Sequence, residues 1–305
     1  MVLIRSSLGV ALALVASIPC SVVAQTRSRS LDPVTTDPAQ IDTTYPPRSV
    51  ELAFQSSGSR VNGLLYLADG KGPHATVILL HGFPGNERNL DLAQALRRAG
   101  MNVLFFSYRG AWGSGGEFSF AHALEDVASA IRFVRADSSV TAFGIDPQRL
   151  TLVGHSMGGW LALMGAAADS SIACTAALDF WNVGADGRRM RRDRELDSTM
   201  IAYSNWLTAP GGPLHADSNE SLVAEMKTHA DGWNPEGSAR ALSSRPILVL
   251  STTANESHPS LVAALRVAHG QRVMALQWKT DHSFSDRRIR LARTLVDWLR
   301  QQCGT

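Results

Sequence analysis

The sequence predicts an α/β fold, with a mostly parallel central sheet, helices on both faces and a helical lid insertion. Continuous apolar runs such as residues 75–82, ATVILLHG, are typical of strands that are buried on both faces. These runs alternate with amphipathic segments across short links, which is the pattern of a parallel sheet covered by helices. The alternation is interrupted once, over about residues 181–240. A length of 305 residues with 45% hydrophobic content suits one domain that carries such an insertion.

The elements follow one another in a regular order from about Ser49 to the C-terminus, so we expect the folded domain to span residues 49–305. The predicted strands are residues 49–55, 60–68, 75–82, 101–108, 149–154, 172–180, 246–252 and 272–280. The predicted helices are residues 89–100, 120–136, 158–168, 258–270 and 286–302. The interruption at about 181–240 contains two further expected helices, and its place between two sheet strands makes it a candidate lid.

The N-terminus has the layout of a secretory signal peptide. Arg5 precedes an apolar run of about a dozen residues and then the tripeptide VVA, which predicts a signal peptide over residues 1–24. An uncleaved anchor is the alternative, but the run is shorter than the roughly 20 residues that span a bilayer. Residues 25–48 are polar and punctuated by proline, as in a flexible lead-in. We therefore expect a secreted or periplasmic protein with no stable membrane insertion after cleavage.

Charge and cysteine content narrow the classes of partner. The formal net charge is +2 and there is no lysine tract, so composition gives no reason to expect a nucleic-acid partner. No Cys/His grouping has zinc-ligand spacing, so no metal is expected. Removal of the leader leaves Cys174 and Cys303, which either form one disulfide or stay as free thiols.

The segment GHSMG, residues 154–158, stands between a predicted strand and a predicted helix. A catalytic serine must stand clear of its own backbone, and a sharp strand-to-helix turn flanked by glycines presents it in that way. The alternative is a serine that caps a buried helix, with glycines that allow close packing. The context favours Ser156 as a nucleophile.

The loop after the strand at 75–82 is a candidate oxyanion hole. Hydrolysis of an acyl group passes through a tetrahedral oxyanion, which needs preorganised hydrogen-bond donors. Backbone N–H groups beside this loop and beside the nucleophile can supply them. We expect the donors to be the amides of Phe83 and Met157.

His282 follows the last predicted strand and precedes the last helix. Because parallel strands place their C-terminal ends together, His282 and Ser156 are expected at one edge of the sheet. The loop after the next-to-last strand contains Glu256, which is our first choice for the acid that orients the histidine. Asp179, at the end of the preceding strand, is the alternative. Asp281 is too close to His282 along the backbone to turn toward its ring.

Four motifs together resemble the α/β-hydrolase superfamily: LLHGFPGNE, YRGAWGSGGE, GHSMGG and TDHSFSD. The resemblance covers roughly residue 49 to the C-terminus apart from the insertion, and it implies the α/β-hydrolase fold. Within the superfamily the chain looks most like esterases, monoacylglycerol-lipase-like enzymes and prolyl-oligopeptidase-like peptidases. These motifs are shared across many substrates, so they imply a fold and a class of nucleophile only.

Carried over residue by residue, the resemblance implies a nucleophile, a base and two oxyanion-hole amides: Ser156, His282, Phe83 and Met157. The chain departs from the family pattern at the acid. The family commonly has an aspartate in the loop after the next-to-last strand, whereas this chain has Asn255 and Glu256 there.

The sequence thus predicts an exported serine hydrolase that cleaves a small-molecule carboxylic ester, through an acyl-enzyme and without a cofactor. A serine exopeptidase or amidase is the alternative within the same fold, because the same triad cleaves amides. Acyl transfer to an alcohol is a third option, governed by the shape of the lid. From a different class, the missing aspartate raises the alternative of a catalytically impaired binding protein.

Overall fold

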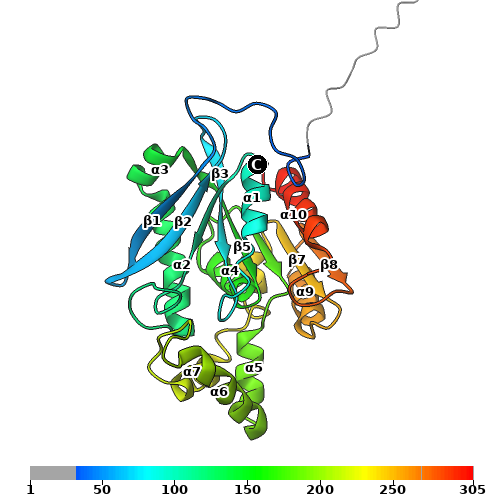
Figure 1. Cartoon of the computed structure of the whole chain (residues 1–305). Helices are drawn as coiled ribbons and strands as arrows, with labels where there is room; N and C mark the ends of the chain where they lie inside the picture. Colours follow the sequence, from blue (N-terminus) through cyan, green and yellow to red (C-terminus); the bar gives the residue numbers. More distant parts are fainter. Residues whose placement is uncertain (1–31, 269, 305) are drawn as a thin grey trace, which may run out of the picture. The chain divides into compact units, whose positions relative to one another are not determined.

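The chain forms an eight-stranded sheet in a computed structural model that describes residues 32–268 and 270–304 (Figure 1). The strands are β1 (Arg48–Ser56), β2 (Ser59–Leu67), β3 (His74–Leu80), β4 (Asn102–Phe106), β5 (Ile145–His155), β6 (Cys174–Leu178), β7 (Ile247–Thr252) and β8 (Val273–Trp278). Their order in the sheet is β1-β2-β4-β3-β5-β6-β7-β8. The pairs β1/β2 and β2/β4 are antiparallel and the other neighbouring pairs are parallel. The predicted α/β class with a mostly parallel sheet is confirmed.

The central strands are apolar on both sides because both faces of the sheet are covered. In β3, Val77 and Leu79 belong to one buried cluster, while Ile78 and Leu80 belong to the other. This alternation follows from the period of two along a strand. A largely apolar run therefore predicts a central strand, as it did for residues 75–82.

Helices pack on each face of the sheet. They are α1 (Leu90–Arg98), α2 (Phe120–Arg135), α3 (Asp137–Phe143), α4 (Met157–Ala168), α9 (Ser257–Val267) and α10 (Arg288–Gln302). The apolar residues of α1 and α10 share one buried cluster with the sheet, and those of α2, α4 and α9 share the other. The helix α4 is buried along most of its length, which matches its alanine- and glycine-rich sequence.

The insertion between β6 and β7 contains four helices rather than the two expected. They are α5 (Val183–Met190), α6 (Arg194–Thr208), α7 (Asn219–His229) and α8 (Ala239–Leu242). Figure 1 shows α5, α6 and α7 grouped at one end of the sheet. The helix α6 is thinly packed, with only Ser204 and Leu207 buried and with Tyr203 and Trp206 exposed.

The predicted signal peptide lies outside the described residues. The expected lead-in is described from Asp32 onward, and it contains no helix or strand before β1 within that described part. It nevertheless makes specific hydrogen bonds: Arg98 donates to the carbonyl oxygens of Pro33 at 2.7 Å and Val34 at 3.0 Å. Across the described residues, no helix is both long and apolar enough to span a membrane.

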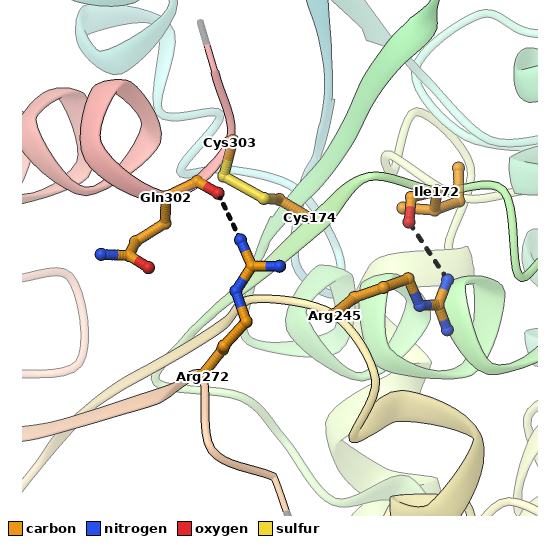
Figure 2. The surroundings of a disulfide bond; sticks show 6 residues. All are labelled: Ile172, Cys174, Arg245, Arg272, Gln302 and Cys303. Carbon is orange, nitrogen blue, oxygen red and sulfur yellow. Dashed lines mark hydrogen bonds between the residues drawn. A yellow bond between two sulfur atoms is a disulfide. The ribbon is translucent and has the colours of Figure 1, made fainter.

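A disulfide joins Cys174, the first residue of β6, to Cys303, the residue after α10. Their Cα atoms are 6.0 Å apart although the residues are 129 positions apart in sequence. Figure 2 shows the bond beside Arg272, which donates to the carbonyl oxygen of Gln302 at 3.0 Å. Of the two alternatives left open by the sequence, the structure therefore has the disulfide.

Candidate active site

Ser156 occupies the sharp turn that joins β5 to α4. Its backbone has φ 58° and ψ −122°, and residues other than glycine rarely adopt such a positive φ. The Ser156 hydroxyl makes no cap hydrogen bond to α4 and has no other hydrogen-bond partner among the described residues. The alternative of a helix-capping serine is therefore not what the structure has, and the hydroxyl remains free for chemistry.

The glycines around Ser156 are required by close backbone contacts. A Cβ atom on Gly154 would lie 1.9 Å from the carbonyl oxygen of Gly158, and one on Gly158 would lie 2.1 Å from that of Leu80. Both distances are far inside van der Waals contact, so neither position can take a side chain without movement of the backbone. The turn and the end of β3 can approach each other only because these residues are glycines.

The loop after β3 lies directly against the serine. A Cβ atom on Gly82 would be 2.9 Å from the Ser156 Cβ and 3.4 Å from its Oγ. The hydroxyl of Tyr108 donates to the His81 carbonyl at 3.0 Å, and His81 Nδ1 donates to the Gly82 carbonyl at 2.7 Å. These bonds hold the loop in place beside the serine.

The two amides expected as oxyanion donors lie on either side of the close approach between Gly82 and Ser156. Phe83 follows Gly82, and Met157 is the first residue of α4. Within the described part of the chain, neither the Phe83 N–H nor the Met157 N–H donates to a protein acceptor. An unpaired amide at the first turn of a helix is a suitable donor for a developing negative charge.

His282 meets Asp179 in the structure. The Nδ1 atom of His282 donates to Oδ2 of Asp179 at 2.6 Å. A carboxylate can only accept, so the hydrogen sits on Nδ1 and the neutral ring leaves Nε2 as its acceptor. A histidine in this tautomer is ready to take a proton at Nε2.

Asp179 is the residue after β6, and its carboxylate is held by donors on two sides. The backbone N–H of Thr252 and the Nδ2 of Asn255 donate to Oδ1 at 2.8 Å and 3.0 Å. Burial acts to raise the pKa of Asp179, but the hydrogen bonds from His282, Thr252 and Asn255 outweigh it, so the pKa lies below its ordinary value. Asp179 is therefore ionised at neutral pH.

The expectation that Glu256 orients His282 needs correction. Glu256 is exposed at the N-terminal end of α9, and no hydrogen bond joins it to His282 among the described residues. His282 instead contacts Asp179, the alternative named above. Asp179 directly follows β6, and β6 pairs with β5, the strand that leads into Ser156. The last residue of β7, Thr252, and Asn255 in the loop after it donate hydrogen bonds to Asp179, and this region does not contribute the acid.

Ser156, Asp179 and His282 line one cavity of about 610 Å³. Its wall also carries charged and aromatic groups from the insertion, including Trp181, Asp186 and Arg189. Trp181 donates from Nε1 to the Asp186 carboxylate at 2.6 Å, which fixes both side chains at the rim. The insertion thus forms part of the candidate site, as its place between β6 and β7 suggested.

Sequence reasoning missed the residues that hold Asp179 and His282 in place. Asn255 was noted only as the neighbour of Glu256, and Thr252 only as a strand end, although both donate to Asp179. His155 was noted only as part of the turn around Ser156, although its Nε2 lies 2.8 Å from the carbonyl oxygen of His282. His155 and Thr252 share one signal, a position at the C-terminal end of a parallel strand, and Asn255 lies in the loop that follows Thr252.

The chain resembles several curated proteins over part of its length. It is 30% identical over 186 residues to the uncharacterized protein YfhR of Salmonella typhimurium, an alignment that covers 61% of this chain and 56% of that protein. It is 29% identical over 163 residues to thiohydrolase apmlB of Arthrinium phaeospermum, covering 48% of this chain and 51% of that one. The chain therefore spans about half the length of the curated relatives that it matches.

Solved structures share the fold at low sequence identity. The esterase Pf2001 of Pyrococcus furiosus has a TM-score of 0.58 and 17% identity, covering 86% of this chain and 93% of that one. The acylaminoacyl peptidase of Pyrococcus horikoshii has a TM-score of 0.59 and 14% identity, covering 87% of this chain and 42% of that one. The family model described as "Alpha/beta hydrolase family" matches residues 77–294, which include the serine turn, Asp179 and His282. On this match, the chain belongs to the alpha/beta hydrolase family.

Proposed function

We propose that the protein is an exported serine hydrolase that cleaves carboxylic esters, with Ser156 as nucleophile, His282 as base and Asp179 as acid. The observation that carries the proposal is the 2.6 Å contact of His282 with Asp179 in the cavity that Ser156 also lines. The amides of Phe83 and Met157 complete the assignment as oxyanion donors. Their unpaired state among the described residues and their place beside Ser156 support this role.

In the proposed reaction, Ser156 Oγ attacks the acyl carbon while His282 Nε2 takes the hydroxyl proton. The tetrahedral oxyanion receives hydrogen bonds from the Phe83 and Met157 amides. His282 then gives its proton to the leaving alcohol, and the acyl-enzyme forms. Water attacks the acyl-enzyme with His282 again as base, which releases the acid and regenerates the serine. The Asp179 carboxylate stabilises the imidazolium in both steps.

Export is part of the proposal. The signal-peptide pattern over residues 1–24 is one support, and the disulfide between Cys174 and Cys303 is an independent one, because such bonds persist in oxidising compartments. The test is to express the full chain with its own leader and to locate the mature protein. Its absence from both the periplasm and the culture medium would overturn the proposal of export.

A peptide or amide substrate is the second candidate. It is favoured by one observation: the carboxylates of Asp186 and Glu256 line the cavity with Ser156, where an amino terminus could pair with them. A thioester belongs in the same comparison because one relative is named a thiohydrolase. Ester hydrolysis is preferred because Asp186 is already engaged by Trp181 and Arg189.

The test is labelling of the purified mature protein with a fluorophosphonate, followed by assays with p-nitrophenyl esters, an acyl thioester and aminoacyl-nitroanilides. We expect stoichiometric labelling and faster turnover of esters than of anilides. Ser156→Ala should abolish both labelling and turnover. Ser257→Ala is the matched control, because Ser257 lines the same cavity and its hydroxyl makes no hydrogen bond to His282 among the described residues.

Two outcomes would contradict the proposal. Labelling that survives Ser156→Ala would remove Ser156 as the nucleophile. A folded protein that neither reacts with the fluorophosphonate nor turns over any of these substrates would favour the binding-protein alternative. Preference for anilides would keep the nucleophile and change the substrate class.

A further inference from the structure

His155 lies under the candidate base. It is the last residue of β5, immediately before Ser156, and only 3% of its surface is exposed. Its ring centroid is 4.6 Å from that of His282, and its Nε2 is 2.8 Å from the His282 carbonyl oxygen. One side chain therefore contacts both the ring and the backbone of His282.

The hydrogen bond fixes the tautomer of His155. A carbonyl oxygen can only accept, so Nε2 of His155 must carry the hydrogen. In a neutral ring Nδ1 then has no hydrogen, and this atom is buried without a partner among the described residues. The contact to the His282 carbonyl is thus the one polar interaction that the His155 side chain makes within that part of the chain.

The ring of His155 is uncharged at neutral pH. Burial is the largest cause that lowers its pKa to about 4, and the neighbouring charge of His282 lowers it further. The hydrogen bond to the His282 backbone and the charge of Asp179 act in the opposite direction, while Arg288 again lowers the pKa. A neutral ring can lie against an imidazole that becomes positively charged during the reaction, whereas a charged ring would repel it.

The His282 side chain needs contacts that hold it in place, because much of its surface is exposed to solvent. Its side chain is 55% exposed, and it lies in a turn between β8 and α10. Asp179 holds only the Nδ1 side of the ring. The backbone of the turn is fixed from the interior by the fully buried Phe284 and by the hydrogen bond from His155.

We propose that His155 is a positioning residue for the reaction: its Nε2–H donates to the His282 carbonyl and so fixes the backbone that carries the His282 imidazole. The inference rests on the proposed function of His282 as base. It assigns to the residue before the nucleophile a role that does not involve contact with substrate.

Two variants separate the hydrogen bond from packing. His155→Phe keeps a planar ring and removes the donor, whereas His155→Gln keeps an N–H donor at similar reach and removes the ring. We expect His155→Phe to lower kcat by about tenfold with KM changed less than about twofold, because misplacement of a catalytic group costs rate rather than binding. We expect His155→Gln to recover most of that kcat. Thermal unfolding confirms that both variants are folded at the assay temperature.

An unchanged kcat in folded His155→Phe, or an equal loss in the two variants, would overturn the inference. Amide hydrogen exchange of residues 279–287 supplies a readout that does not depend on activity. We expect faster exchange in His155→Phe and not in His155→Gln. If the unaltered protein has no hydrolase activity but this difference in exchange appears, the proposed function fails while the structural part of the inference holds. If the parent is active and exchange is equal in all three proteins, the inference alone fails.

Discussion

The ends of two neighbouring strands, β6 and β7, reach the same cavity but differ in what they provide. β6 is followed directly by Asp179, which is buried, has φ 39° and accepts hydrogen bonds from Thr252, Asn255 and His282. β7 is followed by a loop in which Glu256 is exposed. A carboxylate in the expected loop is therefore not enough to make an acid partner. Burial, donors and position at the strand end decide which carboxylate meets the histidine.

The two strand ends work as a pair. The end of β7 and the loop after it supply the donors, and the residue after β6 supplies the carboxylate. Asn255 Nδ2 donates both to Asp179 at 3.0 Å and to the Phe180 carbonyl at 2.9 Å, so it ties the loop to the β6 end. An asparagine suits this place because it can donate, whereas an aspartate there would repel Asp179.

The largest expected effect on kcat is that of a substitution at Asp179, the residue after β6. Asp179→Asn replaces the acceptor of the His282 N–H with a side chain that can favour the wrong tautomer, so we expect kcat to fall by a factor on the order of 10⁴. Steady-state kinetics with the preferred ester measures it. Asp281→Asn is the control, since Asp281 lines the cavity and adjoins His282 but does not contact its Nδ1. A loss smaller than about tenfold in Asp179→Asn would return the assignment of the acid to the β7 loop.

A smaller effect is expected for Asn255, which links the loop after β7 to the end of β6. Asn255→Ala removes one donor from Asp179, and hydrogen bonds to charged groups contribute about 1.5–3 kcal/mol, so we expect roughly tenfold lower kcat. Because this donor lowers the pKa of Asp179, its loss raises that pKa toward the ordinary value.

The same variant has a pH signature. A carboxyl group with a lowered pKa in the folded state contributes stability above its unfolded pKa, and this contribution is lost as the pH falls through the folded pKa. We therefore expect Asn255→Ala to destabilise the protein more at pH 7 than at pH 3, as measured by urea unfolding. A destabilisation that is equal at both values would mean that Asn255 acts on packing rather than on Asp179.

The smallest effect is expected at Glu256. Glu256→Gln removes a charge from an exposed side chain that does not contact His282, so we expect kcat for a neutral ester to change less than about twofold. A fall comparable with that of Asp179→Asn would contradict the assignment of the acid. A fall in kcat/KM confined to substrates with a free amino group would instead favour the peptide alternative.

The features that depend on local sequence pattern could be predicted from the sequence. The strand and helix order brought Ser156, His282 and the loop with Phe83 to one edge of the sheet, because parallel strands leave only one edge for them. It did not identify the acid, because two carboxylates followed adjacent strands and the choice depends on how the β7 loop turns. It also missed His155 and Asn255, whose partners, His282 and Phe180, are distant in sequence. The number of helices in the insertion was underestimated because two of the four are short, α5 with 8 residues and α8 with 4, and short helices carry little periodic signal.

The disulfide between Cys174 and Cys303 places Asp179 and His282, the proposed acid and base, in one covalent ring. Cys174 begins β6, which Asp179 follows, and Cys303 is the residue after α10, the helix that follows the turn with His282. The bond therefore raises the effective concentration of Asp179 at His282 through chain connectivity, in addition to packing. A chain cut before Cys303 would lose this tether while it kept every residue of the site.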